Sequence, residues 1–351
     1  MDELKYTRII QAVIETPWAI LPQKLVVIRD LLAFRAAGGR LTEEELRERL
    51  HGEQRIAARA NNRAGAMEGV AVLPLVGTII PRADMLTESS GGVSIQRFQR
   101  NFRQAINDES ISAIVLDVDS PGGQVGLVDE LSSEIFRARG QKPISAVANN
   151  LAASAAYWIA SAATEMVVTP SGEIGGIGVF AMHEDMSGLL EREGIKVSLI
   201  AAGKYKTDGN PFEPLSDEAR AAIQGRVDEY YDMFLGAVAR NRGRKRSEVR
   251  DGFGQGRVVG SREAVNLGMA DRIATLEETV ERMIGRRSRR SAAADMDFRR
   301  RRLRLAARPG SDETGKALHR GLLYSIQLNC DGGHHEQTVS KIASGAGRPG
   351  A

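Results

Sequence analysis

The sequence predicts an α/β protein with a mainly parallel sheet, crossover helices and a helical amino-terminal segment. Three apolar runs rich in β-branched residues indicate strands, at residues 70–76, 111–118 and 144–148. Helical spacing of apolar residues separates these runs, at residues 95–106 and 127–135. Because strands that alternate with helices are joined by right-handed crossovers, we expect the three strands to lie parallel in one sheet.

Length and composition are those of an ordinary globular protein. The chain has 351 residues, so we expect one large folded unit of about 200 residues with appended segments. The formal net charge is only +3, and a basic run at residues 286–308 carries most of the excess. The charge therefore describes a tail rather than the folded unit, and we expect no nucleic-acid partner.

Two features concern the compartment in which the protein works. Cys330 is the only cysteine, so no intramolecular disulfide can form. Residues 1–5 lack the basic and apolar regions of a secretory signal, and no apolar run approaches the roughly 20 residues of a membrane span. We therefore expect a cytoplasmic protein without a membrane span.

Changes of pattern divide the chain into four predicted parts. Leu25, Ile28, Leu31 and Leu32 lie at helical spacing in the first part, and Ser216 is expected to cap a long amphipathic helix in the third. The parts are a helical amino-terminal segment (1–56), a linker (57–66), the main domain (67–285) and a basic, disordered tail (286–351).

Two segments at predicted strand ends are candidates for chemistry. In residues 120–124, the consecutive glycines Gly122 and Gly123 let backbone N–H groups face a ligand, as an oxyanion hole requires; a plain β-turn is the alternative. In residues 150–160, small side chains around Ser154 leave room for a substrate carbonyl beside its hydroxyl. Taken alone, a serine among alanines is more often a helix cap or a packing residue.

A serine nucleophile needs a base, and three side chains are candidates. His183 is the only histidine within the main domain. A lysine serves instead when burial lowers its pKa from about 10.4 towards about 7 to 8, so that the neutral amine accepts the serine proton. Lys204 and Lys206 are such lysines, and local chemistry prefers neither of them over an ordinary surface lysine.

In combination, these segments resemble the signal peptide peptidase SppA (protease IV) family, whose members are related to ClpP. The resemblance covers roughly residues 70–284 and implies a ClpP/crotonase-like fold. Within the family, the chain is most similar to the capsid-assembly (prohead) proteases of lambda-type phages, which share its Met182-His183 step and its Lys-x-Asp-Gly-Asn-Pro sequence at residues 206–211. Four motifs occur in the family's order and spacing: Ser-Pro-Gly-Gly (120–123), Ala-Ala-Ser-x-x-Tyr-Trp-Ile-Ala (152–160), Gly-x-Ile-Gly-Val (175–179) and Tyr-Lys (205–206).

The resemblance implies a role for each candidate residue. Ring-like oligomers of the family allow the serine and the lysine to come from different protomers, and no metal or nucleotide cofactor is required. His183 remains the alternative base, since ClpP-type enzymes use Ser-His-Asp. The implied catalytic residues are Ser154 as nucleophile and Lys206 as base, with the amides of Gly122 or Gly123 and of Ala155 as the oxyanion hole.

The implied activity is that of a serine endopeptidase of phage head maturation. Its substrates would be extended segments of capsid, scaffold or portal proteins, cleaved after small apolar residues. Gly176 departs from the family pattern, in which a serine often holds the lysine through its hydroxyl. Two alternatives follow: an SppA-type peptidase that degrades signal peptides, and a capsid assembly factor with weak catalysis, which Gly176 motivates.

Two other groups of residues are not interpreted as sites. Cys330, Asp331, His334 and His335 offer too few ligands at zinc spacing, so we predict no metal site. The basic residues 286–304 are interpreted as part of a solvated tail rather than as a nucleic-acid surface.

Overall fold

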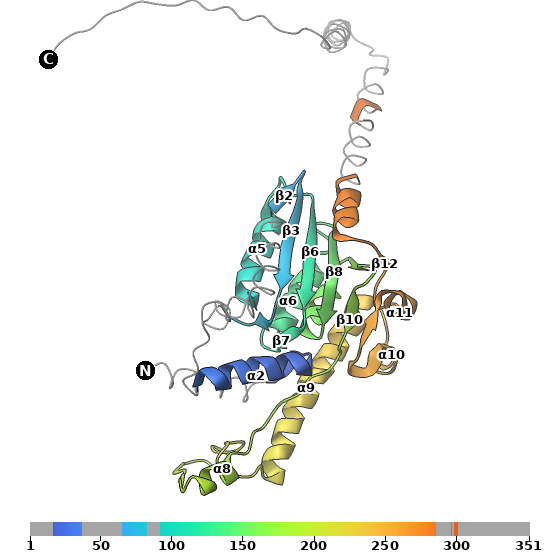
Figure 1. Ribbon diagram of the computed structural model, residues 1–351. Helices are drawn as coiled ribbons and strands as arrows, with labels where there is room; N and C mark the ends of the chain where they lie inside the picture. The colour runs from blue at the N-terminus through green and yellow to red at the C-terminus, as the bar shows by residue number, and fades with distance from the viewer. Residues whose placement is uncertain (1–16, 37–64, 83–91, 286–295, 297, 301–351) are drawn as a thin grey trace, which may run out of the picture. The chain divides into compact units, whose positions relative to one another are not determined.

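The computed structural model describes residues 17–36, 65–82, 92–285, 296 and 298–300 (Figure 1). The chain divides into two compact units, Met1–Arg287 and Ser288–Ala351. The described residues of the second unit are helical, and the following description concerns the first unit. Most of the predicted linker and tail, including Cys330 and the histidines near it, lies outside the described residues.

The predicted strands form the centre of a largely parallel sheet, which has eight strands within the described residues. β3 (Val70–Val76) pairs in parallel with β6 (Ala113–Ser120), and β6 pairs in parallel with β8 (Ile144–Ala153). The first half of β8 then pairs with β9 (Glu165–Val168) and its second half with β10 (Glu173–Gly175), both in parallel. The outer strands are β2 (Gly65–Met67), antiparallel to β3, β11 (Val258–Gly260), antiparallel to β10, and β12 (Arg272–Ile273), parallel to β9.

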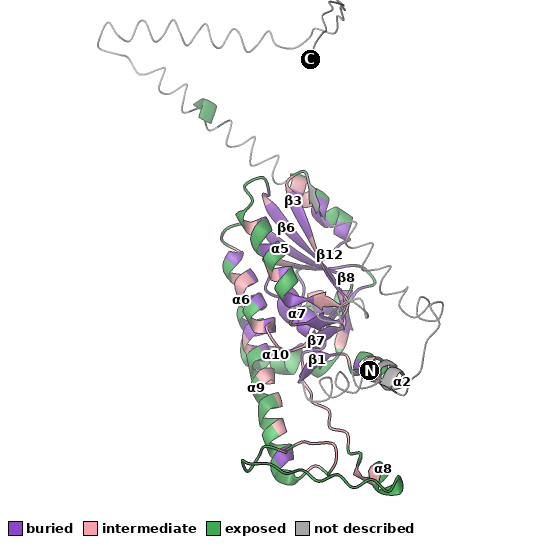
Figure 2. Cartoon of the chain, turned by 90° about the vertical axis from the view of Figure 1, so that its left-hand side faces the viewer, coloured by how far each residue is buried: buried purple, intermediate pink, exposed green. Residues whose placement is uncertain are grey.

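Both faces of the sheet are covered, as is usual for parallel sheets. Along β6, Ile114, Leu116 and Val118 belong to one hydrophobic cluster, whereas Ala113 and Val115 belong to another. A helix over residues 276–285 covers the second cluster, and Figure 2 shows the central strands buried between the two layers. The predicted α/β class is therefore confirmed. The first cluster includes residues of α5 (Ile95–Asn107), α6 (Val128–Ala138), α7 (Ala155–Ala160) and α9 (Asp217–Arg242).

Side-chain caps explain where two of the long helices begin. Ser94 caps α5, and its hydroxyl accepts a hydrogen bond from the N–H of Arg97 at 3.4 Å. Ser216 caps α9 as predicted, and its hydroxyl accepts from the N–H of Ala219 at 3.1 Å. Acidic residues in the first turn of α9 add a favourable interaction with the helix dipole. Both helix starts therefore follow from local sequence.

A second, smaller sheet joins the amino-terminal segment to the main unit. β1 (Trp18–Ile20) pairs antiparallel with β7 (Gly122–Gln124), and its three residues are only 1%, 0% and 3% exposed. β7 also pairs with β4 (Ile79–Ile80), which pairs with β5 (Val93–Ser94). The glycine pair singled out in the sequence thus lies in the strand between β1 and β4.

The amino-terminal segment was expected to be helical and separate, and the structure differs from this expectation at β1. The helix is present as α2 (Pro22–Ala36), with Leu25 buried. Proline explains the boundary, because the residue before Pro22 favours extended conformations while proline itself suits the first helical turn. The four residues between Pro17 and Pro22 are too few for a periodic signal, so the sequence pattern does not reveal this strand.

Between β10 and α9 the chain leaves the core as an extended arm, defined here as residues 183–215 (Figure 1). The arm contains α8 (Ser187–Arg192), none of whose residues is buried. Apolar side chains on the arm face solvent, and Ile200 is 100% exposed. The second half of α9 returns to the core, where Phe234 and Val238 are buried. The arm is therefore an apolar surface that a single chain leaves uncovered.

A buried polar network holds α6, α7 and α9 together behind the sheet. The side-chain amide of Asn241 donates to the hydroxyls of Ser132 (3.1 Å) and Ser161 (2.9 Å). The guanidinium of Arg139 donates to the backbone carbonyl of Asn241 at 2.9 Å. Because an unsatisfied buried polar group is costly, each member of this network depends on the others.

Replacement of Asn241 by alanine should therefore destabilise the fold. We expect Asn241→Ala to lower the free energy of unfolding by about 2 kcal/mol, because two buried hydroxyls lose their donor and a small cavity opens. Asn266→Ala is the matched control, since Asn266 is exposed on α11 (Ser261–Leu267), and it should change stability by less than about 0.5 kcal/mol. Urea unfolding followed by circular dichroism measures both. Equal stability of the two variants would contradict the role of the network.

Candidate active site

Ser154 lies in a strained turn between the end of β8 and the start of α7. Its backbone angles are φ 56° and ψ −121°, a conformation that non-glycine residues rarely adopt. The Ser154 N–H donates to the carbonyl of Gly175 at 2.6 Å, and the Trp158 N–H donates to the carbonyl of Ser154 at 2.9 Å. The Ser154 hydroxyl donates to the carbonyl of Gly178 at 3.4 Å. A strand-to-helix turn of this kind presents a serine hydroxyl at the edge of a sheet.

An irregularity in β8 directs the chain towards this turn. The pairing of β8 with β6 shifts register between Val118 and Ser120. Asn150 has φ 105°, and its side-chain amide donates to Asp119 at 3.0 Å. Because β8 leaves β9 at this point and continues beside β10, Ser154 emerges where the two sheets meet.

Helix α7 gives Ser154 a rigid base. All six residues of this helix are buried. The ring of Trp158 stacks on that of Phe234, with centroids 4.5 Å apart and planes at 11°. The hydroxyl of Tyr157 donates to the carbonyl of Met269 at 3.0 Å, and burial raises the pKa of this phenol, so it stays protonated as a donor.

The predicted glycine pair lies against Ser154. Gly122 has φ +99°, and a Cβ atom added to it would lie 2.2 Å from the carbonyl oxygen of Ala19 and 3.0 Å from the Cβ of Ser154. A Cβ atom on Gly123 would lie 1.8 Å from the carbonyl oxygen of Ile79. Only glycine fits between these neighbouring backbones. The Gly122 N–H donates to the hydroxyl of Ser120 at 3.2 Å.

The two candidate lysines differ in their surroundings. Lys204 donates to the hydroxyl of Tyr205 (2.8 Å) and to the carboxylate of Glu218 (2.9 Å), and these hydrogen bonds raise the pKa of Lys204. A raised pKa is the opposite of what a general base needs. Lys206 is exposed on the arm, and its ammonium has no hydrogen-bond or ion-pair partner among the described residues. No hydrogen bond joins Lys206 to Ser154 within this part of the chain.

His183 and Gly176 have distinct positions. The Nε2 atom of His183 lies 3.1 Å from the carbonyl oxygen of Asn210, at the base of the arm, and among the described residues no hydrogen bond joins it to Ser154. Gly176 follows β10, and a Cβ atom added to it would lie 3.1 Å from the backbone nitrogen of Ser154. A side chain at position 176 would therefore stand beside the nucleophile, which is where the family pattern often has a serine.

Some groups around Ser154 were not foreseen. The carbonyls of Gly175 and Gly178 accept hydrogen bonds from Ser154. Because every residue has a backbone carbonyl, the residue types at these positions do not reveal this role. The hydroxyl of Ser120 accepts the Gly122 N–H and so fixes the turn before the glycine pair. The sequence signal for this role was the position of Ser120 directly before Pro121. β1 is the largest omission, because it contacts the glycine pair from the far end of the sequence.

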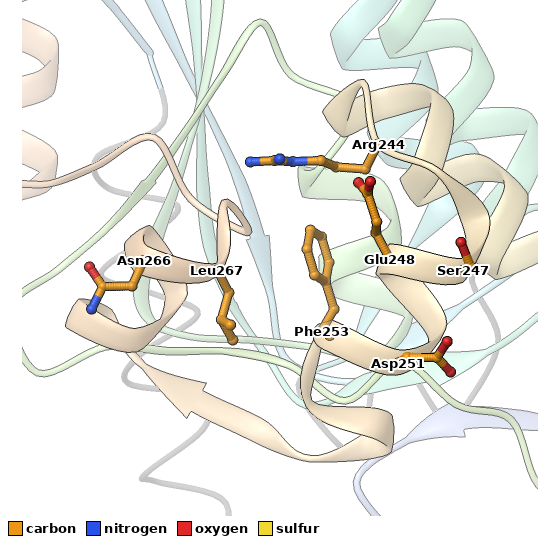
Figure 3. Close-up of a pocket in the computed structure, with 8 residues that line it drawn as sticks. Arg244, Ser247, Glu248, Asp251, Phe253, Asn266 and Leu267 are labelled. Atoms are coloured by element: carbon orange, nitrogen blue, oxygen red, sulfur yellow. The ribbon is translucent and has the colours of Figure 1, made fainter.

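A separate pocket lies between α10 (Arg246–Gly252) and α11 (Figure 3). None of the predicted site residues, Ser154 included, lines this pocket. The pocket is lined by Arg244, Ser247, Glu248, Asp251, Gly252, Phe253, Asn266 and Leu267.

Within the described ranges, no cluster of three His, Cys, Asp or Glu side chains is arranged to hold a metal ion. In the same ranges, no helix is both long and apolar enough to cross a membrane.

Comparison with known proteins identifies the region around this turn. Residues 137–287 match peptidase family S49. Capsid assembly protease C of Escherichia phage lambda is 34% identical over 214 residues, which cover 61% of this chain and 48% of that protein. Head-tail preconnector protein GP5 of Enterobacteria phage P21 is 34% identical over 217 residues, covering 62% and 43%. Protease 4 of Haemophilus influenzae is 28% identical over 235 residues, covering 65% and 36%.

These matches agree with the resemblance derived from the four motifs. The chain spans less than half the length of each of these three relatives. The matched residues 137–287 contain Ser154, Lys206 and His183 but not the glycine pair. The family match also agrees with the predicted ClpP/crotonase-like class, with its largely parallel sheet.

The fit of Gly122 leads to a test by substitution. We expect Gly122→Ala to lower the free energy of unfolding by about 2 kcal/mol, because the added methyl group meets the backbone of Ala19 at an unfavourable φ. Gly140→Ala is the matched control, since a Cβ atom there has no neighbour within 4 Å, and it should cause no loss. Thermal and urea unfolding measure both variants. A Gly122→Ala protein as stable as the parent would contradict the close backbone approach.

Proposed function

Because residues 137–287 match peptidase family S49, we propose that the chain is a serine endopeptidase that uses Ser154 as nucleophile and Lys206 as general base. The observation that carries the proposal is the strained turn, which holds Ser154 beside Gly122 and at the start of α7. A strained backbone conformation persists only where the surrounding contacts hold it, and such residues cluster at active sites.

The chemistry follows from the groups at this turn. The neutral amine of Lys206 takes the proton of the Ser154 hydroxyl, and the oxygen attacks the substrate carbonyl to form a tetrahedral intermediate. Backbone N–H groups stabilise the resulting oxyanion. The Lys206 ammonium then protonates the leaving amine, which gives an acyl-enzyme. A water molecule, deprotonated by Lys206, hydrolyses the acyl-enzyme and returns Ser154 to its starting state.

Two amides are favoured for the oxyanion hole. The Gly122 N–H donates to the hydroxyl of Ser120 within its own turn, whereas the Gly123 N–H faces the carbonyl of Ala19 in the antiparallel pairing with β1. We therefore take Gly123 as the donor of the pair that can bind a carbonyl oxygen. Ala155 is the first residue of α7, and the first N–H groups of a helix have no acceptor within the helix. Gly123 and Ala155 therefore supply the two donors in this proposal.

Lys206 is preferred over the other candidate bases by elimination. The hydrogen bonds of Lys204 to Tyr205 and Glu218 stabilise its charged form. His183 interacts with the carbonyl of Asn210 rather than with Ser154. Lys206 has no competing partner among the described residues, and the arm that carries it projects from the core.

We propose that Lys206 reaches Ser154 of a neighbouring protomer in a homo-oligomer. The arm exposes apolar side chains on both sides of α8, including Met186, Ile195 and Ile200, at 37%, 52% and 100%. An exposed apolar surface of this extent is typical of a protein–protein contact. Docking of the arm on a second copy would bury these side chains together with Lys206.

The relatives suggest the substrates. A capsid assembly protease and a head-tail preconnector protein of phages are 34% identical to the chain, whereas Protease 4 is 28% identical. We therefore prefer a head-maturation peptidase that cleaves capsid, scaffold or portal proteins in the host cytoplasm. Degradation of signal peptides is the second candidate, supported by the match to Protease 4.

Mixing two inactive variants tests the nucleophile and the base, and it also tests whether the two residues come from different protomers. Ser154→Ala and Lys206→Ala should each lower peptide hydrolysis by at least about 10³-fold, because each removes one partner of the proton transfer. Subunit exchange between the two variants should restore about a quarter of the parent activity, because one site in four then combines an intact serine with an intact lysine. Cleavage of capsid and scaffold proteins is measured by gel electrophoresis and mass spectrometry.

Lys204→Ala and His183→Ala are the controls for this experiment, and both should retain activity. Loss of activity in His183→Ala together with an active Lys206→Ala would make the histidine the base. If neither the parent nor any variant cleaves these proteins, the domain is a capsid assembly factor rather than a peptidase, whereas equal cleavage by all of them would exclude Ser154 and Lys206 as the catalytic pair. Failure of the mixture to recover, with both single variants inactive, would assign the lysine and the serine to the same protomer.

The arm gives a separate prediction about assembly. Ile200→Asp should raise the dissociation constant of the oligomer about tenfold or more, because it introduces a charge at a buried apolar contact. Val27→Asp is the control, since Val27 is 62% exposed on α2, outside the arm. Analytical ultracentrifugation over a range of concentrations measures both. Unchanged association of Ile200→Asp would exclude the arm from the interface.

A further inference from the structure

β1 lies directly on the strand that carries the glycine pair. Its register on β7 matches Trp18 with Gln124, Ala19 with Gly123 and Ile20 with Gly122. The ladder extends at both ends, because the Leu21 N–H donates to the carbonyl of Pro121 at 3.0 Å and the Val125 N–H approaches the carbonyl of Pro17 at 3.4 Å. Residues 17–21 therefore bind along the whole of β7, from a position about 100 residues earlier in the chain.

The opposite edge of β1 is also occupied. The Trp18 N–H donates to the carbonyl of Phe180 at 2.9 Å, and the Phe180 N–H donates to the carbonyl of Trp18 at 3.0 Å. Phe180 follows Gly178, whose carbonyl accepts the hydroxyl of Ser154. An extended segment is thus held between two backbone edges, and both edges belong to the turn region around Ser154. Peptide ligands are commonly bound in this way, by addition of a strand.

The carbonyl of Ala19 faces the proposed catalytic groups. In an antiparallel ladder, hydrogen-bonded pairs alternate with non-bonded pairs, so the bonds at Leu21 and Pro17 make Ala19 and Gly123 a hydrogen-bonded pair, in which the Gly123 N–H faces the Ala19 carbonyl. A Cβ atom added to Gly122 would lie 2.2 Å from the carbonyl oxygen of Ala19 and 3.0 Å from the Cβ of Ser154. The Ala19 carbonyl therefore lies beside the glycine amides and on the same side of Gly122 as the nucleophile.

We propose that residues 17–21 occupy the substrate cleft as a tethered peptide, with Ala19 in the place of the substrate residue whose carbonyl is attacked. This inference rests on the proposed function. It explains why Trp18, Ala19 and Ile20 are almost completely buried although they are appended to the sheet by a three-residue strand. It also defines the substrate as an extended segment with a small residue at the position of Ala19.

The tether gives the segment a competitive advantage over free peptides. α2 follows β1 directly, and Leu25 is 1% exposed, so the segment is anchored next to the cleft. Arg29 of α2 forms an ion pair with Glu184 at 3.3 Å, close to Phe180 in the sequence. A segment held this way acts at a millimolar effective concentration, so a substrate must displace it before cleavage.

A binding experiment on the full chain with Ser154→Ala tests the occupancy without cleavage. The probe is a fluorescent peptide with the sequence of residues 14–24. The additional substitution Ala19→Pro removes a ladder N–H and should open the cleft, so that the probe binds about tenfold more tightly. Gln23→Ala, at an exposed position of α2, is the matched control and should leave probe binding unchanged. Fluorescence anisotropy measures the affinities.

Hydrogen exchange on the Ser154→Ala chain covers the case in which Ala19→Pro does not fold. Saturation with the probe should speed exchange at the amides of residues 18–21 and leave those of β3 unchanged. The proposal is wrong if the probe binds without this change, or if a folded Ala19→Pro variant binds it no better. If displacement occurs but Ser154→Ala does not reduce hydrolysis in the parent chain, the peptidase assignment fails and the occupancy of the cleft stands.

Discussion

The arrangement of this molecule depends on the strained turn at Ser154. A non-glycine residue with φ 56° and ψ −121° is unfavourable by itself, so its neighbours must stabilise it. The hydrogen bond from its N–H to Gly175 and the buried helix α7 supply this stabilisation. The same constraint explains why β8 changes partner from β9 to β10: the strand must leave one neighbour before it can end beside the second sheet.

Much of the fold could be predicted from the sequence, and the exceptions have a common cause. β3, β6 and β8 are long enough for their apolar runs to be recognised, and Ser216 marks the start of α9 by the chemistry of its side chain. β1 and β7 have three residues each, too short for any periodic signal. Their existence depends on contacts between residues about 100 positions apart, which a local pattern cannot show.

The candidate site also has a part whose arrangement follows from the sequence and a part whose arrangement does not. Ser154 and the glycine pair follow strand ends of one sheet, so the topology predicted from the sequence was sufficient to bring them together. Lys206 lies on an arm that a single chain leaves exposed, and in the proposed function a second copy brings it to Ser154. The order of the motifs suggested this residue, whereas a local sequence pattern cannot predict a contact between two protomers.

Two features of the single chain act in the same direction. β1 pairs with the glycine strand beside Ser154, and the proposed base lies on the exposed arm. Each arrangement alone would slow hydrolysis, and each is relieved by a different encounter, one with an extended substrate and one with a neighbouring protomer. A peptidase with both requirements cuts only where its own copies and its substrates are concentrated together. An assembling shell, which is the setting proposed above, would fulfil that condition because it concentrates protomers and substrates together.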